Sequence, residues 1–293
     1  MNILYVTVGK LDDYLNDMIF HGLYTLFGNQ VVDSNCMTFM YKPYMTDKNR
    51  SIIHGKGFTL YGTIEKDDID RTEIDKKIRS RFYDLIIYGS VHRYLEYYDL
   101  VKQYYPKNRI AFLDGEDIPH LAYPFCSSHI YFKRELIIDQ PNIFPISFSI
   151  PPKKVIQDRQ SIRAKKNKWI ATCVPDNFNT YIFNDEQTYY KDYQESFFGI
   201  TMKKAGWDCL RHYEIIANYC MPFFIHIGDC PPNTMFNFPK QLCLEASQLL
   251  SGNYSETHYY DLLDAMFDWL LMNLTTDKLA LYVIDTLRSI QKG

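Results

Sequence analysis

The sequence lacks the patterns that mark membrane and secreted proteins. It has no run of about 18 apolar residues, so we expect no transmembrane segment. No basic stretch followed by an apolar one opens the chain, so we expect no secretory signal. Its seven cysteines are an odd number without a Cys-x-x-Cys pair, which is typical of reduced, buried thiols. Together these absences predict a cytoplasmic protein.

Signatures of several ligand classes are absent as well. There is no G-x-G-x-x-G fingerprint, which disfavours a dehydrogenase, and neither a Walker A pattern nor a G-x-S-x-G elbow occurs. The eight histidines show no ligand spacing such as H-E-x-x-H, so we expect no metal site. The net charge of -3 lacks the basic excess typical of nucleic-acid-binding proteins. We therefore expect no nucleic-acid partner.

What is present predicts an α/β protein of two domains. With 293 residues and 46% apolar residues, the chain is long enough for two cores. A basic, polar stretch, Pro151 to Lys168, is the clearest change in composition. We therefore place a boundary at about residue 150, which gives an N-terminal domain over 1–150 and a C-terminal domain over 151–293.

Apolar runs alternate with helical patterns along both halves. Alternation of this kind predicts mostly parallel sheets with helices on both faces. We expect helices over 14–27 and 91–105, and two more in a C-terminal tail, roughly 257–273 and 276–291. The runs that predict strands are 2–8, 30–33, 83–88, 109–113, 130–136 and 143–150 in the first half and 169–174 in the second.

Carboxylates follow two of the predicted strands. Asp114, Glu116 and Asp117 come after the strand at 109–113, and Asp13 follows the first strand of the chain. Open parallel sheets bind ligands at the carboxyl ends of their strands. We take Glu116, Asp117 and Asp13 as candidate catalytic residues, any of which could accept a proton from a substrate hydroxyl. The alternative is that these carboxylates cap the following segments and face water.

The stretch from Phe198 to Phe224 reads as a strand, a basic turn, a helix and a second strand. The turn contains Lys203, Lys204 and Gly206, and the helix that follows carries Arg211, Glu214 and Asn218 on one polar stripe. A helix N-terminus preceded by cations is a favourable place for a phosphate. The alternative is a surface ion pair between Arg211 and Glu214 at i, i+3 spacing.

This stretch, FGITMKKAGWDCLRHYEIIANYCMPFF, resembles the nucleotide-sugar-binding segment of GT-B glycosyltransferases, especially exostosin-like enzymes and the glycan-building transferases of microbes and large viruses. The matching elements are Phe198-Gly199, the turn from Lys203 to Gly206, Arg211 with Glu214, and Cys220-Met221-Pro222. The family often has Ala-Gly where this chain has Asn218-Tyr219.

The resemblance implies two Rossmann-like domains facing a cleft, with a C-terminal helical tail. It implies a hexosyl- or pentosyltransferase of glycan biosynthesis that moves a sugar from a nucleoside-diphosphate sugar to a glycan acceptor. By this likeness Glu214 bonds the donor ribose, while Arg211 and the turn with Lys203, Lys204 and Gly206 hold the diphosphate. No metal and no cofactor besides the donor is implied. A non-catalytic relative that binds a nucleotide sugar or glycan is the alternative.

Overall fold

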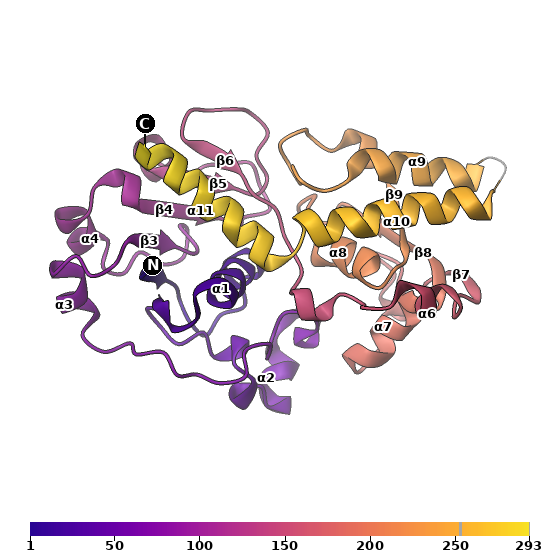
Figure 1. Cartoon of the computed structure of the whole chain (residues 1–293), viewed down its shortest axis with the longest axis horizontal. Helices are drawn as coiled ribbons and strands as arrows, with labels where there is room; N and C mark the ends of the chain where they lie inside the picture. Colours follow the sequence, from indigo (N-terminus) through magenta and orange to yellow (C-terminus); the bar gives the residue numbers. More distant parts are fainter. Residues whose placement is uncertain (252–253, 293) are drawn as a thin grey trace.

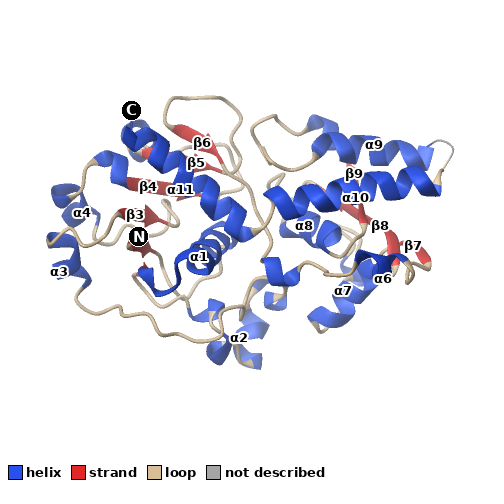
Figure 2. Ribbon diagram, viewed as in Figure 1, coloured by secondary structure: helices blue, strands red, loops and turns tan. Residues whose placement is uncertain are grey.

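The computed structural model describes residues 1–251 and 254–292. Its strands form two parallel sheets, one of six strands in the order β2-β1-β3-β4-β5-β6 and one of three in the order β7-β8-β9 (Figures 1 and 2). The predicted α/β class with parallel sheets is confirmed. The strands are β1 (Ile3–Val6), β2 (Val31–Asp33), β3 (Leu85–Tyr88), β4 (Ile110–Asp114), β5 (Ile130–Lys133), β6 (Ile143–Pro145), β7 (Lys168–Ile170), β8 (Ser196–Met202) and β9 (Met221–Ile225).

The central strands of the larger sheet are apolar because both of their faces are covered. Every residue of β1, β3 and β4 is buried, as expected for a parallel strand between two layers of other elements. The parallel pairing of β1 with β3 and of β3 with β4 places their carboxyl ends at one edge. The segments that follow these strands therefore meet at that edge.

Five α-helices precede β5 in the chain, and one of them is shorter than predicted. The helix expected over 91–105 is only α4, because Tyr97 before it adopts a left-handed φ of 62° that a helix cannot continue through. The helix α1 begins as predicted, with Asp13 as its N-cap. The five are α1 (Tyr14–Phe27), α2 (Asp47–Ile52), α3 (Ile74–Arg79), α4 (Tyr98–Tyr104) and α5 (Phe125–Ser128).

The remaining helices are α6 (Arg159–Arg163), α7 (Glu186–Gln194), α8 (Leu210–Ala217), α9 (Lys240–Ser251), α10 (Glu256–Asn273) and α11 (Thr276–Lys292). The last of them returns to the larger sheet and packs along α1 (Figure 1). The connection between α10 and α11 lies beside Ile150, which donates its N–H to Leu274 O at 2.9 Å and accepts from Thr276 N at 3.0 Å.

The domain division at about residue 150 stays a prediction. No described helix combines the length and hydropathy needed to cross a bilayer.

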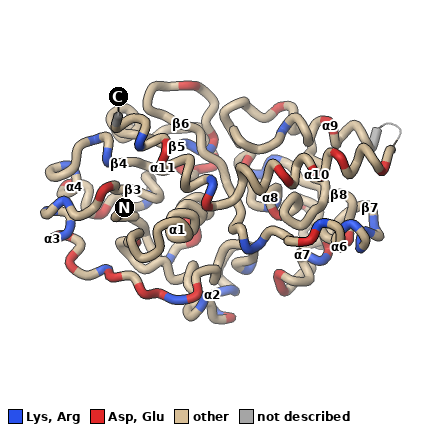
Figure 3. Tube along the Cα trace, viewed as in Figure 1, with Lys and Arg blue, Asp and Glu red and all other residues tan. Residues whose placement is uncertain are grey.

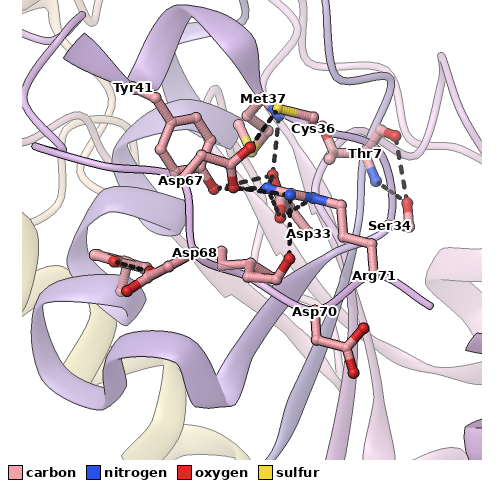
Figure 4. Close-up of polar contacts among 12 residues, drawn as sticks. Thr7, Asp33, Ser34, Cys36, Met37, Tyr41, Asp67, Asp68, Asp70 and Arg71 are labelled. Carbon is pink, nitrogen blue, oxygen red and sulfur yellow. Dashed lines mark hydrogen bonds and ion pairs between the residues drawn. The ribbon is translucent and has the colours of Figure 1, made fainter. Parts of the chain in front are cut away.

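The long connection after β2 is held by an ion-pair cluster at the end of that strand (Figure 4). Arg71 donates from Nε and Nη2 to the two carboxylate oxygens of Asp33, at 2.8 and 2.9 Å, and its Nη1 lies 2.8 Å from Asp67. Asp33 is fully buried, so this two-point pairing compensates a charge that would otherwise be costly. The cluster fixes the path that carries residues 34–71 past the edge of the sheet.

Candidate active site

Asp13 and Glu116, which follow different strands, are brought together by Arg93. The guanidinium of Arg93 lies 3.3 Å from Asp13 Oδ2 and 3.3 Å from Glu116 Oε1. Asp13 also accepts the N–H of Asn16 at 3.3 Å as the cap of α1. Burial raises the pKa of Asp13 above its ordinary value, against the lowering effect of Arg93. The sheet edge thus holds two of the three predicted catalytic carboxylates in one cluster.

Asp117, the third predicted catalytic residue, is paired with a residue that the sequence analysis did not single out. Arg134 follows β5 and has a side chain only 1% exposed. It forms an ion pair with Asp117 and donates from Nε to Gly115 O at 3.0 Å. Three charged residues in a row, Lys133 to Glu135, at the end of a predicted buried strand were the available signal for this position.

Arg134 also connects the larger sheet to the turn before α8. Its Nη1 donates to Asp208 O at 2.7 Å. A Cβ built on Gly206 would lie 2.6 Å from Glu135 Oε1 and 2.9 Å from Asp117 Oδ1. The absence of a side chain at Gly206 is therefore what allows this turn to approach. One predicted donor residue and one predicted catalytic residue, 89 positions apart in the chain, lie in contact.

Asp208 forms a buried polar group behind this contact. Its carboxylate accepts from Phe148 N at 2.5 Å and from Tyr213 OH at 2.9 Å. Burial raises its pKa to about 6, although the nearby Arg134 acts in the opposite direction. The sequence analysis did not single out Asp208. Its partners come from the segment after β6 and from α8, so no local pattern indicates them.

The two predicted donor lysines lie on the exposed side of the turn. The Nζ of Lys203 lies 5.3 Å from the ring centre of Trp207, a cation–π contact. Lys204 forms an ion pair with Asp176. Arg211, on the first turn of α8, lies with its guanidinium 4.9 Å from the ring centre of Tyr181. The turn and the start of α8 thus present three cations, two of them beside aromatic rings.

Glu214 is not on an exposed stripe, which corrects the surface reading of the α8 helix. Its carboxylate accepts hydrogen bonds from Thr59 Oγ1 and, at 2.7 Å, from Tyr189 OH. Burial raises its pKa above the ordinary value. Asn218 is fully buried as well. The helix wheel was right about which residues share a face, but that face is covered by α7 and by the segment around Thr59.

Thr59 belongs to the long connection after β2, and its hydrogen bonds join that connection to α7 and to Glu214. Its N–H donates to Glu186 Oε2 at 2.6 Å, and its hydroxyl lies 2.6 Å from Tyr190 OH. It does so with a left-handed φ of 71°, an unfavourable conformation for a β-branched residue. Strain of this kind persists only where surrounding contacts enforce it. The predicted ribose-binding residue is therefore shielded by a strained segment.

Asp17 lies one helical turn after Asp13, and its buried carboxylate is expected to make the free energy of unfolding depend on pH. Its carboxylate accepts from Asp13 N at 3.1 Å and from Tyr61 OH at 2.7 Å, and burial raises its pKa from 3.8 to about 8. Folding therefore takes up a proton at intermediate pH, and stability falls as pH rises between these two values. We expect Asp17→Asn to flatten the slope by up to about 1.4 kcal/mol per pH unit.

Urea denaturation at several pH values within that window measures the slope. Asp285→Asn is the matched control, because the side chain of Asp285 is 69% exposed and its replacement should leave the slope unchanged. An unchanged slope in Asp17→Asn would mean that Asp17 is ionised in the folded protein.

Within residues 1–251 and 254–292, the structure brings no three His, Cys, Asp or Glu side chains into an arrangement suited to a metal ion. The site described above instead combines carboxylates with guanidinium groups. It can hold a hydroxyl-bearing group beside Asp13 and Glu116, and its cations near Gly206 can meet negative charge.

Comparison with known proteins found a likeness only at the level of structure. No family model matches the chain, and no curated protein matches it. A solved α-glucosyltransferase in complex with UDP and a 13-mer DNA containing an HMU base matches with a TM-score of 0.51 and 12% identity, over 98% of this chain and 99% of that one. The α-glucosyltransferase with UDP and a 13-mer DNA containing a central A:G mismatch matches with a TM-score of 0.48, 12% identity and the same coverage.

These comparisons contradict the partner prediction. The structure matched at a TM-score of 0.51 contains DNA beside UDP, so the expectation of a glycan acceptor and no nucleic acid was wrong. That expectation relied on the net charge, which is a sum over all residues of the chain. Contacts with phosphates depend instead on where individual cations lie. Figure 3 shows basic and acidic positions interspersed along the trace, with several basic ones near α6 and β7.

The likeness at a TM-score of 0.51 concerns the fold, and it agrees with the two parallel sheets described above. It does not distinguish the exostosin-like group, which stays a prediction. The chain therefore has the fold of a GT-B type glucosyltransferase.

Proposed function

We propose that this chain is a glycosyltransferase that moves a sugar from UDP-sugar to a hydroxyl group on a nucleic acid. The observation that carries the proposal is the contact between the turn at Gly206 and Asp117, bridged by Arg134. It joins the residues predicted to hold the donor diphosphate to those predicted at the acceptor. The structure matched at a TM-score of 0.51, which holds UDP and DNA together, supports the choice of donor and acceptor class.

In this proposal the donor lies along the start of α8. Lys203, Lys204 and Arg211 supply positive charge for the diphosphate, and Gly206 allows their turn to lie against Glu135 and Asp117. Negative charge that develops on the leaving diphosphate is met by these cations and the helix N-terminus. Asp13, Glu116 and Asp117 line the acceptor side and orient its hydroxyl. The proposal includes no metal and no cofactor besides the donor.

In this proposal Glu214 bonds the donor ribose, which requires its carboxylate to become accessible. Because Thr59 and Tyr189 occupy its carboxylate, the segment around Thr59 has to move before a ribose can reach it. We expect Glu214→Gln to weaken UDP binding by about 5- to 50-fold, since a hydrogen bond to a charged group is worth about 1.5–3 kcal/mol, partly retained by the amide.

Thermal-shift titration with UDP, GDP and their sugars tests donor binding, because a ligand that binds only the folded state raises the melting temperature. Glu256→Gln is the matched control, since Glu256 is exposed on α10. An unchanged UDP affinity in Glu214→Gln would remove Glu214 from the donor site. No shift with any nucleotide would contradict the proposed function itself.

A non-catalytic nucleotide-sugar-binding protein is the second candidate. The observation that favours it is the closed surroundings of Glu214, with both carboxylate oxygens bonded inside the protein. Hydrolysis or transfer separates the two candidates. A chain that binds UDP-sugars but turns over none of them, with DNA acceptors or with water, is the binding protein.

A further inference from the structure

Residues 54–62, part of the long connection after β2, form a strap across the surroundings of Glu214. Its residue Phe58 packs against an apolar cluster whose other described members all lie between residues 171 and 220. Within that cluster the ring centre of Phe58 lies 5.9 Å from the ring centre of Tyr189 on α7. The strap therefore comes from the first half of the chain but packs into the second half.

Polar contacts attach the strap to the second half at two points. Lys56 Nζ donates to Phe183 O at 2.9 Å and to Asn184 Oδ1 at 2.7 Å. Three residues later, the hydroxyl of Thr59 donates to Oε1 of Glu214. A ribose would offer hydroxyl groups to the same carboxylate, so Thr59 makes the contact that the nucleotide is proposed to make. The strap and the nucleotide therefore compete for one acceptor group.

Both ends of the strap are fixed to α1 by other contacts. Near its start, Tyr14 OH donates to His54 O at 3.2 Å. Near its end, Tyr61 OH donates to the buried carboxylate of Asp17 at 2.7 Å. Neither contact involves the second half of the chain. The residues between these two points can therefore move off α7 and α8 while the strap stays attached to α1.

The backbone of the strap is strained in this closed position. Five of its residues have a left-handed φ, between 57° and 71°: Gly55, Lys56, Gly57, Thr59 and Gly62. Glycine adopts this region without penalty, but Lys56 and Thr59 are less stable there, and Thr59 is β-branched. Such strain persists only while surrounding contacts enforce it. Contacts with the second half therefore hold the strap closed, and the loss of these contacts favours an open form.

We propose that the strap is an autoinhibitory contact, which occupies Glu214 in place of the donor ribose and has to leave it before UDP-sugar binds. The inference rests on the proposed function, in which Glu214 bonds the ribose. The apparent affinity for UDP is then the intrinsic affinity multiplied by the fraction of molecules in which the strap is open. Once bound, the ribose hydroxyls replace the hydroxyl of Thr59, so the nucleotide holds the strap open.

Calorimetric titration with UDP tests the competition in two variants that weaken the closed form. Thr59→Val keeps the shape of the side chain but removes the hydroxyl that occupies Glu214, and Lys56→Met removes the two bonds of the ammonium group. We expect UDP to bind about 5- to 50-fold more tightly to Thr59→Val and about 2- to 10-fold more tightly to Lys56→Met. Thr257→Val and Lys48→Met are the matched controls, because both residues are exposed, on α10 and α2. Their UDP affinity should stay within about twofold of the original.

Trypsin cleavage after Lys56 reports the position of the strap independently of affinity. UDP should raise the melting temperature, because it binds the folded protein, and at the same time speed this one cleavage, because it holds the strap open. Lys56→Met identifies the fragment, since this variant lacks the cleavage site. A strap that only joins the two halves of the chain would be cleaved no faster with UDP than without it.

Tighter UDP binding by the strap variants, or UDP binding by Thr59→Val alone, supports the inference. If the unaltered protein binds UDP, unchanged or weaker binding by Thr59→Val overturns the inference but leaves the proposed function standing. Cleavage after Lys56 that UDP does not speed has the same meaning. Lys56 is exposed, so Lys56→Met keeps the test decisive if Thr59→Val fails to fold. Absence of UDP binding by the unaltered protein and by both variants overturns the proposed function, and the role of the strap with it.

Discussion

Replacing Arg134 by methionine is expected to destabilise the protein by about 3–5 kcal/mol. The guanidinium is 1% exposed and is the counter-charge of Glu135, at 3.4 Å, as well as of Asp117. It also donates to the backbone carbonyls of Gly115 and Asp208. Removing the guanidinium leaves the carboxylate of Glu135, which is only 6% exposed, desolvated without compensation, and that cost exceeds what methionine regains by packing.

Urea denaturation measures the free energy of unfolding for this variant. Arg288→Met is the matched control, since Arg288 is 52% exposed and, among residues 1–251 and 254–292, forms an ion pair only with Asp285. We therefore expect a change within about 0.5 kcal/mol. Arg134→Lys should fall between the two, because lysine keeps the charge but cannot make the same set of hydrogen bonds. A loss below about 1 kcal/mol for Arg134→Met would show that the network does not hold the turn at Gly206 to the sheet.

Gly22→Ala is expected to destabilise the protein by about 3 kcal/mol, against the usual trend for a helix. In the interior of an exposed helix this change stabilises by about 0.5–1 kcal/mol. Here a Cβ would lie 2.0 Å from Thr276 O and 2.9 Å from Ala280 Cβ, at the crossing of α1 and α11. A backbone carbonyl cannot yield as a flexible side chain can, so α11 has to move away from α1.

The free energy of unfolding and the rate of proteolytic cleavage within α11 both report this movement. Gly228→Ala is the matched control, because its Cβ would meet nothing nearer than Leu244 Cδ2 at 3.6 Å. Stabilisation of Gly22→Ala, or cleavage no faster than in Gly228→Ala, would contradict the close crossing of the two helices.

The sequence analysis was most accurate where local pattern decides structure. Buried apolar runs such as Ile3–Val6 and Ile110–Asp114 form parallel strands, because a strand covered on both faces needs apolar residues on both. The helix over 91–105 was too long, because its apolar periodicity could not reveal the left-handed turn at Tyr97. Periodicity identifies an element more reliably than its ends.

The candidate site was predictable only in part. The carboxylates after two strands were recognised, because parallel strands end at one edge, and the structure places Asp13 and Glu116 together there. Arg134 was missed. Three charged residues in a row after a predicted buried strand were the signal for it, but such a run does not show which partners the arginine meets after folding.

By itself, the sequence determined the α/β class, the parallel strands and the grouping of Arg211 and Glu214 on one helix face, because these follow from spacing along the chain. Only the tertiary structure decided what covers that face. Thr59 is 155 positions from Glu214, yet it bonds the carboxylate and buries it. A helix period orders neighbours within one turn or two, whereas burial and charge compensation depend on segments that meet only after the chain has folded.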